Sequence, residues 1–187
     1  MLNTPNMLSI FRLCLVPVFV LLYFSGLPHA NIYALLVFLL ATFTDFLDGY
    51  LARRFHLITN LGKVLDPLGD KMLTFSVLVC LTISKIIPLW ALGVFFLKEL
   101  LMGIGGLILH RRAHVEIPPS NYLGKTATVL FFLVCAVLVF FKDSINNTPG
   151  LATWLICGCL AVALAAFVSY GIRFLKIMKK KDNGNAL

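Results

Sequence analysis

Six apolar stretches occupy most of this chain, and each has about the 20 residues that an α-helix needs to cross a bilayer. Residues that favour turns separate them, as in Ser25-Gly26-Leu27-Pro28. Apolar residues make up 60% of the sequence and charged residues 13%, against about 25% charged residues in an average soluble domain. We therefore predict an all-α, polytopic membrane protein with six transmembrane helices and a short amphipathic N-terminal segment. The predicted spans are 7–27, 31–54, 61–84, 88–110, 122–141 and 150–176.

The sequence contains no linker and no obvious internal repeat. We expect residues 1–177 to form a single membrane domain and residues 178–187 to form a basic, frayed tail. Basic residues gather in the loops after the second and fourth spans and at the C-terminus, whereas the opposite loops carry only Lys85 and Lys142. By the positive-inside rule, both termini should be cytoplasmic, and an even number of spans satisfies this. The predicted location is the cell membrane.

The net charge of +8 raises the question of nucleic acid, but the chain contains no soluble basic module with interleaved aromatic residues. In a membrane protein, such a charge is typical of cytoplasmic loops and of contact with anionic lipids. We therefore expect membrane lipids, and no nucleic acid, as partners. All five cysteines lie inside apolar stretches without metal-site spacing, which indicates packing. The first apolar stretch also lacks the cleavage site of a signal peptide.

Half of the eight acidic residues lie between positions 45 and 70, within or at the edge of apolar stretches. A charge at the bilayer centre costs about 3 kcal/mol or more, so such residues are presumed to be functional and paired. Nearby cations, namely Arg53, Arg54, Lys63 and Lys71, are one possible set of partners, although cations at helix ends usually point outward. The four acidic residues are Asp45, Asp48, Asp66 and Asp70.

Helical geometry predicts how these carboxylates are arranged. At about 100° per residue, Asp45 and Asp48 share one helix face, and Asp66 and Asp70 lie one turn apart on the next helix. Antiparallel helices joined by a short loop are neighbours, so the two acidic faces can meet. Four carboxylates at close range repel one another unless cations lie between them, and hard oxygen ligands suit Mg²⁺ or Mn²⁺. Small residues on the same faces leave space for a nucleotide diphosphate; they are Gly49, Ala52 and Gly62.

The segment 45–70 also resembles a known family. It reads Asp-Phe-Leu-Asp-Gly-Tyr-Leu-Ala-Arg, eight residues, Gly62, three residues, Asp66, three residues and Asp70. This pattern agrees with the signature of the CDP-alcohol phosphatidyltransferases at all eight defined positions. The six-span layout and the start of the chain, Asn3-Thr4-Pro5-Asn6 followed by Arg12, resemble family members that make phosphatidylglycerophosphate.

The resemblance implies an enzyme of phospholipid biosynthesis that transfers a phosphatidyl group from CDP-diacylglycerol to glycerol 3-phosphate and releases CMP. It implies two divalent metal ions, Mg²⁺ or Mn²⁺, a cytoplasmic active site and a homodimer. Asp70 would contact one metal ion and act as general base. The metal ligands implied are Asp45, Asp48, Asp66 and Asp70. The residues implied to bind the CDP-lipid are Asn6, Asp48, Gly49, Ala52, Arg53 and Gly62.

Three cytoplasmic basic residues, Arg111, Arg112 and Lys125, are candidates for holding the acceptor phosphate, although topology and lipid attraction also explain basic residues there. Phosphatidylglycerophosphate synthases often carry Gly-Lys-x-Lys-Thr before the fifth span, and this chain lacks the second lysine of that pattern at residues 124–128. They often have Arg-Glu where this chain has Lys98-Glu99. We expect these two side chains to face different sides of the helix, because adjacent helical residues do not face each other.

Two other functions remain as alternatives. A cardiolipin synthase of the same superfamily would use phosphatidylglycerol as the acceptor. A divalent-cation transporter would use the aspartates as an ion pathway, but it explains neither the small residues of the signature nor the scarcity of acidic residues in the last three spans.

Overall fold

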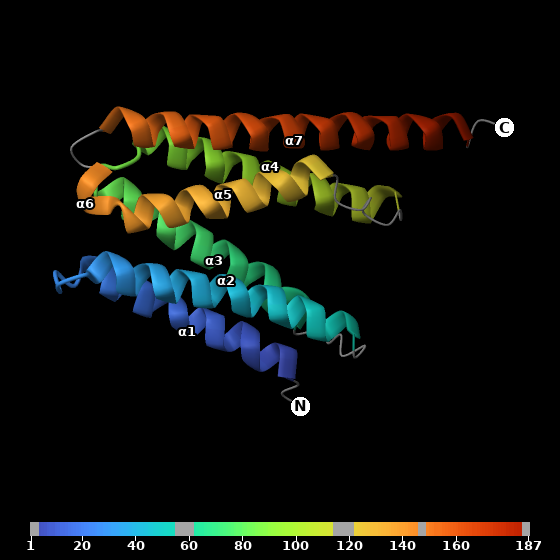
Figure 1. Cartoon of the computed structure of the whole chain (residues 1–187). Coiled ribbons are helices and arrows are strands. Elements are labelled where there is room, and N and C mark those ends of the chain that lie inside the picture. The colour runs from blue at the N-terminus through green and yellow to red at the C-terminus, as the bar shows by residue number, and fades with distance from the viewer. Residues whose placement is uncertain (1–3, 55–61, 114–121, 146–148, 185–187) are drawn as a thin grey trace. The chain divides into compact units, whose positions relative to one another are not determined.

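A computed structural model describes residues 4–54, 62–113, 122–145 and 149–184, with side chains at 7–47, 68–105, 124–145 and 150–172. Within these ranges the chain is helical and contains no strand, as predicted from the sequence. Figure 1 shows the helices in chain order. The helices are α1 (Thr4–Phe24), α2 (Ala30–Arg54), α3 (Gly62–Ile83), α4 (Leu89–Ala113), α5 (Tyr122–Phe140), α6 (Lys142–Ile145) and α7 (Pro149–Gly184).

Each predicted span corresponds to one long helix. Within the described residues, three stretches are long and apolar enough to cross a bilayer: Met7–Phe24, Ala30–Leu47 and Gly150–Ile172. A shorter apolar helix covers Gly124–Phe140. Side chains are described over only 68–83 of α3 and 89–105 of α4, and both stretches are shorter than a bilayer span.

Two boundaries differ from those expected. Asn6, placed by the sequence in a separate amphipathic segment, lies in the first turn of α1. At the other end of the chain, α7 continues to Gly184, so the backbone of the expected frayed tail is helical to that residue.

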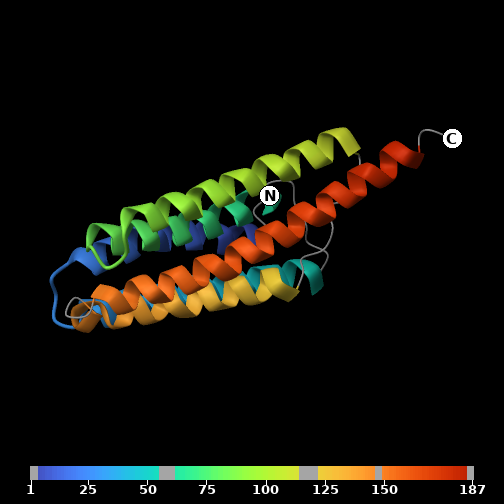
Figure 2. The same ribbon diagram turned by 90° about the horizontal axis from the view of Figure 1, so that it is seen from above.

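The first of two compact units contains residues 1–86 and 135–149. In this unit α1 packs along both α2 and α3, which contact each other much less. Figure 1 shows α1 and α2 as an antiparallel pair, and Figure 2 shows α3 along α1. The buried residues Leu15, Phe19 and Tyr23 recur at helical spacing on α1, and the ring of Phe19 lies 6.3 Å from that of Phe38 on α2. The apolar core of this unit is therefore centred on α1.

The second compact unit contains residues 87–134 and 150–187. The first part of α5 lies against both long helices of this unit. Its Phe131 ring stacks on Phe95 of α4 at 4.8 Å, and the Leu130 carbonyl oxygen lies 3.9 Å from the Cys159 thiol of α7. A Cβ atom at Gly124 would lie 3.0 Å from the hydroxyl oxygen of Tyr170, so glycine permits the close approach of α5 to α7.

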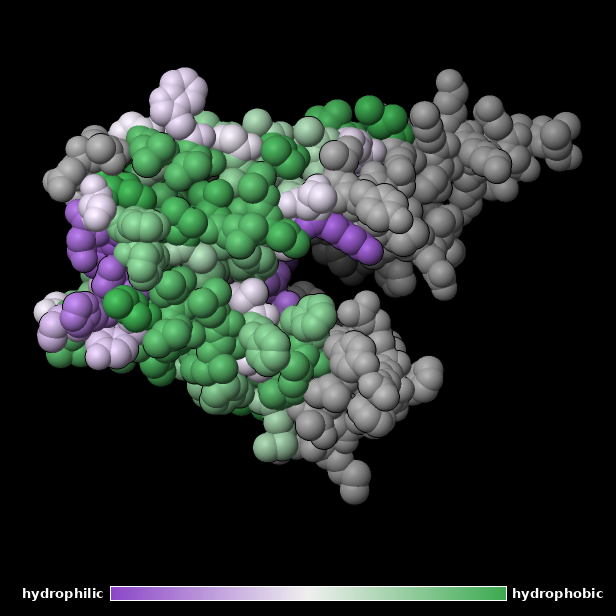
Figure 3. Space-filling view, viewed as in Figure 1, coloured by the Kyte–Doolittle hydropathy of each residue, from purple (hydrophilic) through white to green (hydrophobic). Residues whose placement is uncertain are grey.

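Large apolar side chains cover much of the outer surface of these helices. Phe43 and Phe46 on α2 and Trp154 on α7 are more than half exposed. Green, the colour of hydrophobic residues, dominates the described surface in Figure 3, and purple gathers where Figure 1 places α6 and the turn between α1 and α2. Exposed apolar helices that are long enough to span a bilayer indicate an integral membrane protein.

Candidate functional site

Both halves of the acidic segment lie on helices, as the spacing predicted. Asp45 belongs to α2, and Asp70 belongs to α3. The side chains of both are described, and so is that of Lys125, which is exposed in the first turn of α5. For the other predicted site residues the structure describes helical backbone only, and their side chains lie outside the described residues. These are Asn6, Asp48, Gly49, Ala52, Arg53, Gly62, Asp66, Arg111 and Arg112.

The Asp45 carboxylate pairs with an arginine from another helix. Arg12 of α1 is 0% exposed, and its Nη1 atom lies 2.6 Å from Oδ1 of Asp45. The Asp45 side chain itself is 42% exposed. Because an uncompensated buried charge is strongly unfavourable, the guanidinium depends on this carboxylate. The ion pair therefore ties α1 to the beginning of the acidic segment.

Helix α3 approaches the side chain of Arg12 at a glycine, Gly69. A Cβ atom at Gly69 of α3 would lie 3.4 Å from Nη1 of Arg12 and 3.5 Å from its Cδ atom. The main-chain oxygen of Ser9, also on α1, would lie 3.9 Å away. Gly69 immediately precedes Asp70, so Asp45 and the residue next to Asp70 meet at one guanidinium. We call Ser9, Arg12, Asp45 and Gly69 the Arg12 cluster.

Sequence reasoning considered only cations that lie near the aspartates in the sequence as their partners. The side chains of Arg53, Arg54 and Lys63 lie outside the described residues, and the structure adds Arg12, on a different helix, as a partner of Asp45. A sequence signal for it existed, because Arg12 is the only charged residue in the apolar stretch 7–27. A charge in such a stretch calls for a partner of opposite sign, and Asp45 lies in the next stretch.

The described donors fit a hard divalent cation. Asp45 and the half-buried Asp70 offer carboxylate oxygens, which suit Mg²⁺ or Mn²⁺. The exposure of the Asp45 side chain leaves part of its carboxylate accessible beside the ion pair. Among the residues with described side chains, no three His, Cys, Asp or Glu residues form a metal-binding group. Asp48 and Asp66 lie outside that set, so the four-carboxylate arrangement stays a prediction.

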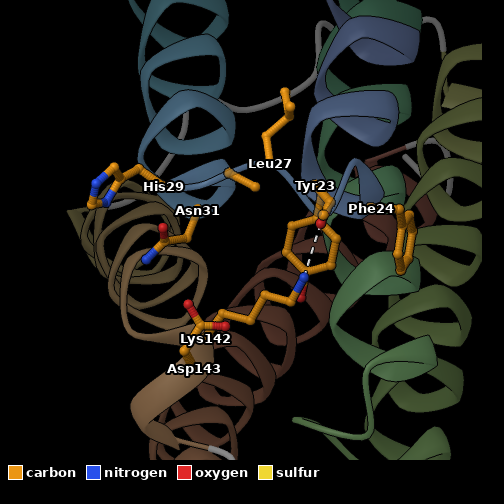
Figure 4. A pocket seen from close by; sticks show the side chains of 9 residues that line it. Tyr23, Phe24, Leu27, His29, Asn31, Lys142 and Asp143 are labelled. Carbon is orange, nitrogen blue, oxygen red and sulfur yellow. Dashed lines mark hydrogen bonds between the residues drawn. The ribbon is translucent and has the colours of Figure 1, made fainter.

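The opposite end of α1 holds a second cation, which was not anticipated. The ammonium of Lys142 on α6 donates a hydrogen bond of 2.8 Å to the main-chain oxygen of Tyr23 and lies 4.1 Å from the centre of the Tyr23 ring (Figure 4). Its position at the C-terminus of α1 suits the negative end of the helix dipole. The amide of Asn31 donates a 2.6 Å hydrogen bond to the Phe140 carbonyl oxygen and ties α2 to α5.

A pocket of 310 Å³ lies beside Lys142, with Asn31 and Asp143 on its wall. Lys142 is already bound to α1 there, and the other polar side chains in Figure 4 come from the end of α1 (Tyr23), the turn (His29), the start of α2 (Asn31) and α6 (Asp143). We regard this region as a structural closure of the α1–α2 turn. The residues that line it are Tyr23, Phe24, Gly26, Leu27, His29, Ala30, Asn31, Lys142 and Asp143.

The expectation for Lys98 and Glu99 is wrong. Their side chains form an ion pair of 2.6 Å, and the Lys98 ammonium also lies 4.8 Å from the Phe95 ring centre. Both are long, flexible side chains, and they bend toward each other although their Cβ atoms point apart. In this low-polarity helix, mutual neutralisation lowers the cost of two charges.

Comparison with known proteins connects these helices to one family. The family model described as CDP-alcohol phosphatidyltransferase matches residues 2–168 and so runs through both compact units. The cardiolipin synthase (CMP-forming) of Streptomyces coelicolor is 41% identical over 84% of this chain and 75% of its own length.

Two relatives carry the name CDP-diacylglycerol–glycerol-3-phosphate 3-phosphatidyltransferase. The protein of Bacillus subtilis is 33% identical over 80% of each chain. The protein of Rickettsia bellii is 33% identical over 95% of this chain and 96% of its own length. The resemblance seen in the acidic segment therefore extends over nearly the whole chain.

Proposed function

Because this chain belongs to the CDP-alcohol phosphatidyltransferase family, we propose that it transfers a phosphatidyl group from CDP-diacylglycerol to glycerol 3-phosphate. The hydroxyl oxygen of glycerol 3-phosphate attacks the phosphorus atom that carries the lipid, and the bond to CMP breaks. Family membership confirms the prediction of an enzyme and disfavours the transporter. The meeting of Asp45 and Gly69 at Arg12 is the geometric observation that supports a reaction centre between α1, α2 and α3.

The carboxylates of both motif helices hold two divalent ions, Mg²⁺ or Mn²⁺, in this proposal. When bound, these ions neutralise the pyrophosphate and the charge that develops on the departing CMP. Asp70 accepts the proton of the acceptor hydroxyl as general base. Its position on α3, directly after the glycine that contacts Arg12, supports this role. The ligands are Asp45, Asp48, Asp66 and Asp70.

The CDP-lipid lies along the small residues of the motif. Glycine and alanine leave room for a nucleotide against the helix backbone, and the guanidinium of Arg53 offers donors to a phosphate. Asn6 in the first turn of α1 adds an amide on the same helix as Arg12. The small residues are Gly49, Ala52 and Gly62.

We infer that six spans cross the cell membrane and that this centre lies at its cytoplasmic surface, with both termini on the same side. Within the described residues, three helical stretches have the length and composition of spans, and in this proposal α3, α4 and α5 cross as well. The concentration of basic residues at one end of the helices supports the orientation. A homodimer follows from the family resemblance alone.

The acceptor phosphate is held by basic residues at the end of α4 and the beginning of α5. Arg111 and Arg112 close α4, and Lys125 is exposed in the first turn of α5 in the same compact unit. A phosphate monoester carries nearly two negative charges at neutral pH, so three cations suit it well. This favours glycerol 3-phosphate as the acceptor.

A second acceptor, phosphatidylglycerol, is favoured by a different observation. The cardiolipin synthase of Streptomyces coelicolor is more similar in sequence, at 41% identity, than either synthase named for glycerol 3-phosphate. The missing second lysine at residues 124–128 agrees with an acceptor of lower charge. With this acceptor, the enzyme would make cardiolipin and release CMP.

An acceptor panel tests the proposal. Detergent-solubilised protein receives CDP-diacylglycerol and Mg²⁺ or Mn²⁺, with glycerol 3-phosphate, phosphatidylglycerol, serine or inositol phosphate, and CMP and the lipid product are measured. We expect CMP and phosphatidylglycerophosphate with glycerol 3-phosphate, and neither when the metal is chelated. Cardiolipin from phosphatidylglycerol alone would establish the second candidate. Release of CMP with no acceptor in the panel would overturn both.

A further inference from the structure

We propose that Arg12 is a positioning residue of the metal centre, which holds the Asp45 carboxylate in the orientation that binds the cation. This inference rests on the proposed function, because it takes Asp45 as a metal ligand. The contact that carries it is the 2.6 Å approach of Arg12 Nη1 to Asp45 Oδ1. A carboxylate in so short a contact with a buried guanidinium has a restricted orientation.

The packing of α1 fixes the guanidinium before any ligand binds. Arg12 and Ser9 are both 0% exposed, one helical turn apart, and Leu15 lies a turn further along the same buried face. A guanidinium that is excluded from solvent on all sides has little freedom to rotate. The position of Asp45 Oδ1 is therefore determined by the core of the unit and not by the exposed part of α2.

Gly69 closes the arrangement from the third helix. A Cβ atom there would lie in van der Waals contact with the Arg12 side chain at 3.4 and 3.5 Å, so alanine fits but a longer side chain would displace Arg12. Arg12 is thus enclosed by the backbone of α3 on one side and bonded to α2 on the other. The same residue sets the spacing between Asp45 and the part of α3 that carries Asp70.

Arg12 has two effects on metal binding, and they have opposite signs. The direction in which Mn²⁺ affinity changes when Arg12 is replaced therefore tests the proposal. A fixed positive charge near Asp45 repels a cation, so its removal would strengthen metal binding if charge alone mattered. Groups that orient a ligand carboxylate usually strengthen metal binding by 10- to 100-fold, so their removal weakens it. The complete burial of Arg12 and its 2.6 Å contact with Asp45 favour orientation as the larger effect.

The experiment measures Mn²⁺ affinity in the full-length, detergent-solubilised protein by electron paramagnetic resonance of the free ion. Arg12→Gln removes the charge, Arg12→Lys keeps it without the planar fork, and Lys142→Gln is the matched control. Lys142 is a cation bound to the same helix α1, but at its other end. Unfolding temperatures in EDTA and the separate kcat and KM values for CDP-diacylglycerol accompany each affinity.

We expect Arg12→Gln to weaken Mn²⁺ binding at least about 10-fold and Arg12→Lys to recover part of this loss. We expect the kcat of Arg12→Gln to fall more than its KM changes when Mn²⁺ is saturating. Lys142→Gln should keep the wild-type affinity, even where its unfolding temperature falls. Unchanged or tighter Mn²⁺ binding in Arg12→Gln would overturn the positioning role.

Two further outcomes are also informative. Wild-type protein that binds no Mn²⁺ would overturn the proposed metal chemistry itself, and the inference with it. Failure of both Arg12 variants to fold with Mn²⁺ present would show that Arg12 serves folding, which contradicts a positioning role. If the wild type binds Mn²⁺ and Arg12→Gln binds it more weakly, the positioning role is supported separately from the proposed function.

Discussion

One cation lies within the N-terminal half of α1 and another contacts its C-terminus, and the two cations are bound in different ways. Arg12 is fully buried and contacts a carboxylate of the acidic segment, whereas Lys142 reaches the helix from α6 and contacts the neutral Tyr23 carbonyl and ring. An ion pair in a buried position demands a particular partner, while a carbonyl at a helix end accepts any nearby donor. The comparison separates a contact that we propose serves the reaction from one that closes a turn.

The largest expected difference is in kcat, between substitution of the acidic residue near Arg12 and substitution of the one beside Lys142. Asp70→Asn should lower kcat by about 100-fold or more, because it removes the proposed general base. Asp143→Asn, beside Lys142, should leave kcat unchanged, because Asp143 is exposed and lies in the α1–α2 closure. CMP release at saturating substrates measures both.

Asp70→Asn should also retain nucleotide binding better than Asp48→Asn. Equal, near-normal turnover of those two variants would refute the assigned roles.

The next difference concerns stability. Arg12→Met should lower the free energy of unfolding by about 3 kcal/mol, the lower end of the range for broken buried pairs, because Asp45 remains partly solvated. Lys142→Met should cost about 1 kcal/mol, from one charge-assisted hydrogen bond and a cation–π contact. Denaturant unfolding in mixed micelles compares them. A larger loss of unfolding free energy for Lys142→Met than for Arg12→Met would contradict this prediction.

Two glycines should respond differently to side-chain size. Gly69→Ala should be nearly neutral and Gly69→Leu should cost about 1–3 kcal/mol, because the longer side chain meets Arg12. Gly26 has a φ of 64° and no atom within 4 Å of a Cβ atom, so Ala and Leu should cost the same, about 1 kcal/mol. Unfolding temperatures of the four variants check this. If Leu lowered the unfolding temperature more than Ala at Gly26, side-chain space would matter there, which would contradict a cost that comes from backbone conformation alone.

The smallest effect is expected at Asn31. Asn31→Ala removes the hydrogen bond to the Phe140 carbonyl oxygen and should lower stability by about 0.5–1 kcal/mol, since the site is accessible to water. CMP release should remain at the wild-type level at temperatures where the variant is folded. A loss of turnover in that variant would show that the region around Lys142 takes part in the reaction, which contradicts the purely structural role assigned to it.

The sequence predicted the long helices well because turn residues separate apolar stretches of suitable length. The third expected span, 61–84, agrees closely with α3 (Gly62–Ile83). The four-residue helix α6 was not predicted, since so short a segment has no measurable periodicity. The helical end of α7 to Gly184 was also missed, because composition favours fraying where lysines accumulate.

The candidate site was predicted only as far as local spacing allowed. The motif assigned Asp45 and Asp70 to adjacent helices, and the structure brings Asp45 and Gly69 to the same guanidinium. The Arg12 contact joins residues on two consecutive helices, so the period of a single helix does not predict it. The Lys98–Glu99 pair shows the reverse error, because side-chain flexibility overcame the geometry of the backbone.

The most direct test counts Mn²⁺ ions by electron paramagnetic resonance of the bound metal in wild-type protein and in Asp45→Asn and Asp70→Asn. Carboxylates of α2 and α3 that share one centre predict two Mn²⁺ per chain at the spacing of about 3.5–4 Å found in two-metal sites, with a spin-coupled spectrum. Each substitution should then reduce occupancy and abolish the coupling. Uncoupled Mn²⁺, or binding that neither substitution changes, would contradict a metal centre built from these two helices.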